Sequence, residues 1–376
     1  MKIVVDTHFI TTGLATGNGT YTVELINALV ALNDKDEFIL YAIEDHPYYR
    51  MFDNNPRVKI KFVLSRNGFV RNYISIPKAL AEDIPDVVHL FFIVPFFLKQ
   101  PVVLTVHDLF YVHMENANLY QRMIGKLTLS GIHRAHKVIT ISEYSRKDII
   151  ATCRIDNAKV LAIPLGINKR FKPVLKSEPA LFRNLPTCEY ILFIGRTEDS
   201  RKNLLTLIDA FSALKLDGKI SQKLVIAGRH GAGSDILFRR VDELGLRDDV
   251  IFPGIVSDND LVPLLSGARL FVYVSSFEGF GLPVLEAMAC GVPVITSNVT
   301  SLPEVAGDAG YMVTPKSVKE LSDAIMQILS DNELSSLMIK RGYLQAEKFT
   351  WQQTAMQTMA VYEGIYSIST NRDLPH

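Results

Sequence analysis

One stretch of the chain, residues 270–296, constrains the fold more than any other. It opens with an apolar run of branched and aromatic residues, 270–274, which is short and predicts a buried strand. A loop with two glycines follows, and Pro283 stands where a helix would begin, at a position that needs no backbone N–H. A second strand begins at residues 293–296. Strand, loop, helix and strand in this order are typical of a parallel α/β sheet.

The same loop has the properties of an anion-binding site. A helix that begins directly after a glycine loop presents free backbone N–H groups and the positive end of its dipole to a ligand. Two carboxylates flank this turn. Glu278 lies in the loop before the helix, and Glu286 lies about one turn into it, where it can hydrogen-bond hydroxyl groups beside a bound anion.

The complete string around the two glutamates carries a specific resemblance. It reads Phe277-Glu278-Gly279-Phe280-Gly281-Leu282-Pro283-x-x-Glu286-Ala287-x-Ala289-x-Gly291-x-Pro293-Val294-Ile295. This string resembles the signature of retaining nucleotide-sugar glycosyltransferases of family 4 (group 1). The alternative for these residues is an ordinary strand-to-helix turn with solvated carboxylates. The resemblance implies that Glu278 lies near the reacting sugar, that Glu286 holds the ribose, and that the turn of Phe280, Gly281 and Leu282 faces the donor diphosphate.

The order of the predicted elements indicates two α/β domains, each with a doubly wound parallel sheet. Seven predicted strands alternate with helices between residues 3 and 163, and a second alternating series begins at residue 191. The segment between them, 169–189, is polar, contains three prolines and predicts a linker. The resemblance implies the GT-B architecture, in which two Rossmann-like domains face a central cleft. Residues 1–168 would form the acceptor-side domain, residues 190–350 the donor-binding domain, and a last helix, 351–370, would cross back to the first domain.

Several helix boundaries are predicted from local signals. Helices are expected over 20–32, 74–81, 261–265 and 333–349, and Ser142 is expected to cap a helix over 143–152. Ser142 also has a family counterpart near the cleft, so a ligand role is its second interpretation.

Composition narrows the classes of function. Lys and Arg total 40, as do Asp and Glu, so no net charge would attract nucleic acid. The three cysteines, Cys153, Cys188 and Cys290, are scattered, which fits a reducing compartment and not a metal site. The N-terminus reads as a strand and not as a signal peptide, and the most apolar run, 90–98, is far shorter than the ~20 residues that span a bilayer. We therefore expect a cytoplasmic protein with at most peripheral membrane contact.

Two cations follow the first strand of the second half. Arg196 and Lys202 lie in one strand-to-helix loop, where they suit a diphosphate and the negative charge that develops on a departing nucleotide. The family has an Arg and Lys pair that binds the diphosphate at this place. The alternative is a solvated basic turn in which Asn203 caps the helix, and Arg201 is assigned to the surface.

A glycine loop, 13–19, follows the first strand and can cradle phosphate or sugar, with Gly17 and Gly19 as the favoured contacts. It lacks the Gly-x-Gly-x-x-Gly fingerprint, which argues against a Rossmann oxidoreductase. His107 ends another buried strand, where the family has a histidine that contacts the donor sugar. Its alternative is a structural histidine, with the neighbouring Asp108 as a turn residue.

The base of the nucleotide is assigned through the resemblance alone to Gly228, Arg229 and Ile255, and ordinary turns are an equally good interpretation of these residues. Two Asp-x-Asp strings, 34–36 and 258–260, do not follow a strand at the active edge, and capping explains the second. We expect no metal and no cofactor, because the nucleotide sugar is itself the substrate.

The acceptor is the least determined part. The aromatic run 90–98, and three cations around residues 73–77, namely Arg66, Arg71 and Lys78, would suit a lipid-linked acceptor at an anionic membrane; a packed strand edge with solvated charges is the alternative. The resemblance makes a growing glycan, with a mannose-type donor sugar, the expectation. A nucleotide-sugar epimerase of the same fold and a non-catalytic nucleotide-sugar sensor are the rival functions.

Overall fold

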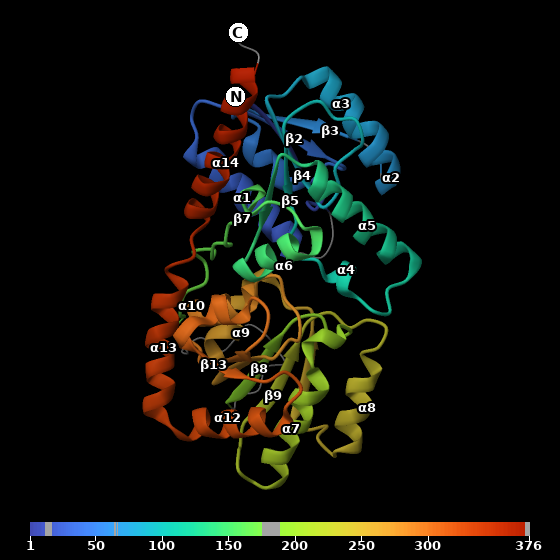
Figure 1. The fold of residues 1–376 in the computed structure, drawn as a ribbon. Coiled ribbons are helices and arrows are strands. Elements are labelled where there is room, and N and C mark those ends of the chain that lie inside the picture. The colour runs from blue at the N-terminus through green and yellow to red at the C-terminus, as the bar shows by residue number, and fades with distance from the viewer. Residues whose placement is uncertain (12–16, 64, 66, 175–188, 373–376) are drawn as a thin grey trace. The chain divides into compact units, whose positions relative to one another are not determined.

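The computed structural model describes residues 1–11, 17–63, 65, 67–174 and 189–372 (Figure 1). The chain forms two compact units, one of Met1–Gly166 with Thr350–His376 and one of Ile167–Phe349. Each is a parallel sheet with connecting helices, so the predicted fold class of two doubly wound α/β domains is confirmed. Most of the proline-rich segment predicted as a linker, 175–188, lies outside the described residues.

The sheet of the first unit has the order β3-β2-β1-β4-β5-β6-β7, and all its neighbouring strands are parallel. Its strands are β1 (Lys2–Asp6), β2 (Glu37–Ala42), β3 (Val58–Phe62), β4 (Val87–Phe91), β5 (Val102–Thr105), β6 (Lys137–Thr140) and β7 (Val160–Ala162). The direction of winding reverses between β1 and β4, where Val4 pairs with Ile39 on one side and with Val88 on the other. Such a switch point leaves a crevice beyond the carboxyl ends of the strands, where open α/β sheets bind ligands.

The helices of this unit are α1 (Gly17–Leu32), α2 (Gly68–Val70), α3 (Ile76–Asp83), α4 (Phe110–His113), α5 (Leu119–Arg134), α6 (Glu143–Cys153) and α14 (Trp351–Arg372). Short 3-10 turns, η1 (Pro47–Phe52) and η3 (Asn157–Lys159), and a π turn, η2 (Arg71–Ser75), complete it. The prediction of a helix over 74–81 was wrong at both ends. The helical path begins at Gly68, because α2 continues directly into the π turn η2 and then into α3, and α3 ends at Asp83. Ser142 caps α6 by accepting a hydrogen bond from Ser145 N, as predicted.

The last helix, α14, packs against α1 in the first unit. Tyr362 on α14 lies 2.5 Å from His89 Nδ1 on β4, and His89 Nε2 lies 2.6 Å from Thr105 Oγ1. His89 is therefore fully buried with both ring nitrogens bonded.

The second unit has the sheet order β10-β9-β8-β11-β12-β13, again entirely parallel. Its strands are β8 (Tyr190–Ile194), β9 (Lys223–Ala227), β10 (Val250–Gly254), β11 (Leu270–Tyr273), β12 (Val294–Ser297) and β13 (Gly310–Val313). Its helices are α7 (Leu204–Leu216), α8 (Asp235–Glu243), α9 (Asp258–Gly267), α10 (Leu282–Ala289), α11 (Leu302–Ala306), α12 (Val318–Ser330) and α13 (Asn332–Ala346), with 3-10 turns η4 (Ser200–Lys202) and η5 (Gly307–Ala309). The switch point lies between β8 and β11.

Two predicted boundaries are corrected in this unit. Helix α9 begins at Asp258 and not at Leu261, because Ser257 is its cap and accepts a hydrogen bond from Asp260 N. Asp258 and Asp260 therefore lie in the first turn of the helix, where their negative charge interacts favourably with the helix dipole, and neither is the N-cap residue. Helix α13 ends at Ala346, three residues before the predicted end.

Among the described residues, no helix combines the length and the apolar character that crossing a bilayer requires. Cys153 and Cys290 are buried free thiols, and Cys188 lies outside the described residues.

Candidate active site

The predicted donor residues of the second unit gather at its switch point. Arg196 and Lys202 lie in the loop after β8, and Glu278 lies in the loop after β11, the strand that neighbours β8. Because parallel strands end at one edge, the topology itself brings these two loops together.

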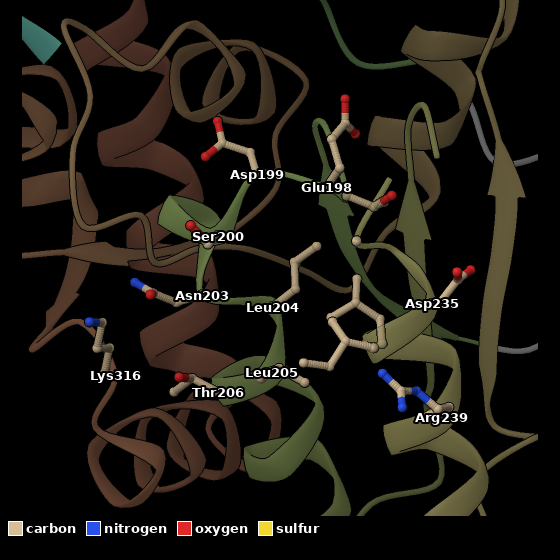
Figure 2. Close-up of a pocket in the computed structure, with 14 residues that line it drawn as sticks. Glu198, Asp199, Ser200, Asn203, Leu204, Leu205, Thr206, Asp235, Arg239 and Lys316 are labelled. Atoms are coloured by element: carbon tan, nitrogen blue, oxygen red, sulfur yellow. The ribbon is translucent and has the colours of Figure 1, made fainter. Parts of the chain in front are cut away.

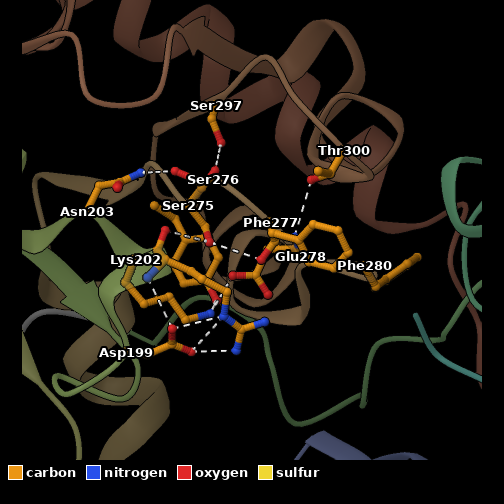
Figure 3. A network of polar contacts seen from close by, with 12 residues as sticks. Asp199, Lys202, Asn203, Ser275, Ser276, Phe277, Glu278, Phe280, Ser297 and Thr300 are labelled. Carbon is orange, nitrogen blue, oxygen red and sulfur yellow. Dashed lines mark hydrogen bonds and ion pairs between the residues drawn. The ribbon is translucent and has the colours of Figure 1, made fainter. Parts of the chain in front are cut away.

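Lys202 and Glu278 form a direct ion pair (Figure 3). The Nζ of Lys202 donates to Glu278 Oε1 and, at 2.5 Å, to the hydroxyl of Tyr273 at the end of β11. The side chains of Lys202 and Glu278 are only 9% and 14% exposed. Burial alone would lower the pKa of Lys202, but Tyr273 and Glu278 raise it above its ordinary value, so the ammonium is fully charged. The sequence predicted both residues but did not predict that they bond to each other.

The loop that carries Glu278 is held by hydroxyl groups from the chain after β12. Ser301 Oγ donates to the carbonyls of Glu278, at 2.9 Å, and Phe280, at 2.8 Å, while Glu278 N donates to Thr300 Oγ1 at 3.3 Å. From the other side, Ser275 Oγ donates to the carbonyl of Arg201 at 3.1 Å. These hydrogen bonds pair backbone groups of the loop and hold the loop that carries Glu278 in one conformation.

The turn into α10 requires glycine at one position. Gly281 has φ 122°, and a Cβ there would lie 2.7 Å from Leu302 Cδ2. The helix begins at Leu282 with Pro283 in its first turn, as predicted, and no side chain caps its N-terminus. Phe280 is buried and packs edge-on against Phe349, with ring centroids 5.6 Å apart, so its side chain is structural and only its backbone is available to a ligand.

Two predictions in the loop after β8 are corrected. Asn203 precedes α7 but makes no side-chain cap; its Nδ2 donates at 2.7 Å to Val274 O and to Ser276 Oγ, which joins the loops after β8 and β11. Arg201 is half-buried and pairs with Asp199 at 2.5 Å, and is not the solvated surface residue that we expected.

Sequence reasoning missed Glu198. Its Oε1 accepts from Arg196 Nε at 3.1 Å and from Arg229 at 2.9 Å, so one carboxylate joins the predicted diphosphate cation to a predicted base residue. Although burial would raise the pKa of Glu198, its own backbone N–H and the two guanidinium groups lower it. Arg196 is 61% exposed and makes no contact with Lys202. A carboxylate between two cations in one loop was the available signal.

The predicted base residues divide into two sets. Gly228 has φ 143°, and a Cβ on it would lie 1.7 Å from Gly195 O, so glycine is obligatory where the loops after β8 and β9 touch. Arg229 joins this contact through Glu198. Ile255 is exposed after β10, and no ring or polar contact connects it to the others.

Glu286 lies one turn into α10, as predicted, and is half-buried. Burial raises its pKa to about 7, and Arg170 opposes this shift. Arg170 pairs with Asp258 at 3.1 Å and comes from the segment predicted as a linker, so no local pattern indicated that it lies near Glu286. A carboxyl group with this pKa changes its charge near neutral pH.

A cavity of about 720 Å³ in the second unit does not coincide with these groups (Figure 2). It lies between the first turns of α7 and α8, and Glu198 and Asp199 border it. Lys202, Glu278 and Glu286 do not line it.

In the first unit, His107 follows β5 and is 7% exposed. Its Nδ1 donates to Asn18 Oδ1 at 2.7 Å, and its Nε2 is buried without a hydrogen-bond partner. Burial lowers the pKa of His107 to about 4, so the ring is neutral and Nε2 carries a lone pair. Gly17 and Gly19 lie within the first turn of α1, which begins three residues earlier than predicted, and Gly13 lies outside the described residues.

The three cations predicted to face a membrane-bound acceptor do not form one charged surface. Arg71 is buried and paired with Asp6, so it cannot meet a membrane. Lys78 is exposed, and Arg66 lies outside the described residues. In the aromatic run, Leu90 and Phe91 are buried, whereas Phe97 is 99% exposed.

The Asp-x-Asp strings have structural partners. Asp36 binds the N-terminal amine and Asn33, and Asp258 binds Arg170. Within the described ranges, no three His, Cys, Asp or Glu side chains converge as metal ligands would.

Two family models match the chain over its two halves. A model described as Glycosyltransferase Family 4 matches residues 15–171, and one described as Glycosyl transferases group 1 matches residues 183–345.

Relatives of known name cover the whole chain. The O-antigen chain mannosyltransferase B of Escherichia coli is 32% identical over 96% of this chain and 100% of its own length. Among solved structures, sucrose-phosphate synthase from Thermosynechococcus elongatus superposes with a TM-score of 0.76 at 23% identity, over 98% of this chain and 99% of its own. Anabaena Alr3699/HepE, solved with UDP and glucose, gives 0.73 at 18% identity, over 96% and 99%. These two likenesses concern the fold.

Proposed function

The chain belongs to glycosyltransferase family 4, group 1, and we propose that it transfers a mannose-type hexose from a nucleoside-diphosphate sugar to a growing glycan during the assembly of a cell-surface polysaccharide. The O-antigen mannosyltransferase of Escherichia coli supports both the sugar and the setting. The structural relative solved with UDP and glucose supports a nucleotide-sugar donor. No relative favours the epimerase or the sensor.

The single observation that carries the proposal is the bonded group of Lys202, Glu278 and Tyr273 at the switch point of the second sheet. An ammonium group has three N–H donors. Tyr273 and Glu278 take two of them, so a third is available to an oxygen of the donor diphosphate. One lysine can thus fix Glu278 and bind the leaving group at the same time.

The proposed mechanism is electrostatic. As the glycosidic bond breaks, the sugar gains oxocarbenium character and the diphosphate gains negative charge. Lys202, Arg196 and the N-terminus of α10 stabilise the diphosphate, and Glu278 orients the sugar hydroxyls close to the developing cation. In the same proposal Glu286 accepts hydrogen bonds from the ribose, and the Nε2 of His107 accepts a hydrogen bond from the sugar. The base is contacted by Gly228, Arg229 and Ile255. The phosphates are approached by Gly17 and Gly19.

We further propose, from the family resemblance, that transfer retains the anomeric configuration. We also propose that it needs no metal, because Lys202, Arg196 and the α10 dipole supply positive charge where the diphosphate leaves. An NMR assignment of the product anomer tests retention. Loss of turnover in EDTA that magnesium or manganese restores would contradict metal independence.

We propose peripheral membrane contact for an exposed apolar strip of the first unit, made of Phe69, Ile74, Phe96 and Phe97. The ring of Tyr73 contacts two of them, at 4.9 Å from Phe69 and 5.0 Å from Phe96, and Phe96 lies 6.3 Å from Phe97. Such a strip fits the headgroup layer that holds a lipid-linked acceptor. In a liposome sedimentation assay, the wild type should be found in the pellet with the liposomes, and the double variant Phe69→Ser with Phe97→Ser should stay in the supernatant.

The function as a whole is tested with a panel of GDP-, UDP-, dTDP- and ADP-sugars. We expect one donor class to bind and to be hydrolysed slowly without acceptor, with release of the free sugar. Conversion of the donor into its epimer instead, with no transfer to any mannoside, would contradict the proposal.

A further inference from the structure

We propose that His8, in the loop directly after β1, binds a hydroxyl group of the acceptor sugar; this assignment rests on the proposed function. The loop lies at the switch point of the first sheet, where β1 neighbours β4. The sequence singled out no residue here, and the acceptor site had no defined member.

The imidazole of His8 is held in one orientation. His8 Nδ1 donates to Asp6 Oδ2 at 2.9 Å, and the backbone N–H of His8 donates to Asp6 Oδ1 at 3.2 Å. A carboxylate can only accept, so Nδ1, the nitrogen that faces it, carries a proton, and Nε2 is the ring nitrogen left for a ligand. His8 Nε2 has no hydrogen-bond partner among the described residues, and the side chain is 23% exposed. The second ring nitrogen therefore lies on the side of the ring away from Asp6.

Asp6 is itself fixed by a buried cation. The guanidinium of Arg71 donates to Asp6 Oδ2 and, at 2.8 Å, to Asn72 Oδ1. Although burial alone would raise the pKa of Asp6, Arg71 and His8 hold it well below its usual range. Burying an ion pair costs desolvation energy that a pair of apolar residues would not. Arg71 and Asp6 are thus positioning residues for His8, and this explains why Arg71 lies buried in a π turn, a feature frequent at functional sites.

Thr7, the residue before His8, is satisfied by contacts within the unit. Thr7 Oγ1 donates to Tyr41 O at 2.9 Å and lies 2.7 Å from the hydroxyl of Tyr49. A purely structural histidine in the same unit looks different, because His89 is fully buried and uses both ring nitrogens. The free Nε2 of His8 is therefore not needed to hold the fold.

Aromatic rings connect His8 to His107 along the same sheet edge. The ring of His8 lies 3.9 Å from that of Phe9, Phe9 lies 6.0 Å from Phe92, and Phe92 lies 5.6 Å from His107. Aromatic surface with a few fixed polar atoms is the usual lining of a small-molecule site. Two histidines along an aromatic surface suit sugar hydroxyls. His107 is already proposed to contact the donor sugar, and His8 then contacts the acceptor sugar.

The test uses two variants and a matched control. His8→Gln removes the oriented ring nitrogen, and His8→Phe keeps the ring contact with Phe9. The control is His113→Gln, which breaks an exposed His–Asp pair of the same unit, His113 Nε2 to Asp148 at 2.8 Å. Measured are the KM for octyl α-mannoside, the Kd of the nucleoside diphosphate, and the rate of donor hydrolysis without acceptor.

We expect both His8 variants to raise the acceptor KM about 10-fold, with nucleotide binding and acceptor-free hydrolysis within about twofold of the wild type, and His113→Gln to change none of these. An unchanged acceptor KM in a folded His8 variant, or an equal loss of donor hydrolysis, would overturn the assignment. If the wild type hydrolyses donor but transfers to no mannoside, the assignment fails while donor binding stands. If it neither binds nor hydrolyses any donor, the proposed function fails first.

Discussion

The switch points of the two sheets have the same topology and opposite chemistry. Between β8 and β11 the side chains are ionic, with Lys202 bonded to Glu278 and hydroxyl groups holding the loop backbone. At the ends of β1, β4 and β5, the ion pair of Asp6 with Arg71 is buried, and the neighbouring side chains include the ring of Phe92 and the neutral imidazole of His107. A charged edge stabilises a diphosphate that gains charge, whereas an edge of mainly neutral and apolar groups suits the hydroxyls and apolar faces of sugars. This difference supports the proposal that the donor's leaving group binds to the second unit.

We expect the largest effect on activity from a substitution of Glu278 at the charged edge. Glu278→Gln keeps the shape and a hydrogen-bond acceptor for Lys202 but removes the charge near the developing oxocarbenium ion. We expect kcat to fall about 10³-fold while the Kd of the nucleoside diphosphate stays within about threefold, by calorimetry. Equal losses of turnover and nucleotide binding would instead assign Glu278 a structural role.

Lys202→Met should give the next largest effect, because it removes a charged donor to the diphosphate. Nucleoside-diphosphate binding should weaken about 10- to 100-fold, and the free energy of unfolding should fall because Glu278 is left unpaired. The double variant with Glu278→Gln should recover stability but not binding. Arg196→Ala should weaken binding only a few-fold, since Arg196 is 61% exposed. Normal binding by Lys202→Met would exclude the third N–H from the diphosphate.

His107 tests the neutral edge. His107→Ala should lower kcat about 10-fold through the lost hydrogen bond to the sugar, with no change in binding of the nucleotide alone. Because its pKa is about 4, the ring is neutral from pH 5.5 upward. The ratio of wild-type to variant kcat should therefore be constant between pH 5.5 and 8.5. A ratio that changes near pH 6.5 would show that His107 titrates and that this edge is not neutral.

The smallest effect is expected from Glu286, whose carboxyl group should make nucleotide affinity depend on pH. With its pKa raised to about 7, the carboxyl is protonated on acidification and accepts fewer ribose hydrogen bonds. Nucleotide affinity of the wild type should fall about threefold from pH 8 to pH 6, and that of Glu286→Gln should not change. The folded protein holds this proton between about pH 4.5 and 7 and the unfolded chain does not, so the carboxylate destabilises the fold above pH 7, by at most about 3 kcal/mol.

Thermal unfolding at pH 8 provides the check. Glu286→Gln should raise the Tm at pH 8 and leave it nearly unchanged at pH 4.5, where both proteins are neutral at this position. A lower Tm of the variant at pH 8 would contradict the raised pKa.

Much of the site could be found from local patterns, because loops that follow neighbouring parallel strands must meet. Glu278, Lys202, Gly281 and the proline at the start of α10 are recognisable in this way. Contacts that depend on where side chains point were not recognisable. Glu198 joins two arginines from different loops, and Asn203 bonds across to the loop after β11, whereas the alternative interpretation of this turn had made it a helix cap.

Burial decided the remaining errors. Arg71 resembles a surface cation in the sequence, yet it is buried against Asp6, 65 residues earlier in the chain. Likewise, the partner of buried His89 is Tyr362 on α14, 273 residues later in the chain. No local signal reports partners at such separations.

The sequence by itself determined the two parallel sheets, the order of their strands and helices, and the glycine turn before α10, because hydrophobic periodicity and backbone conformation are local properties. Only the tertiary structure decided which nitrogen of His8 and of His107 is left without a partner, and which charges are paired. These depend on the desolvation and direction of groups far apart in the chain, and they turn a list of polar residues into a chemically specific site.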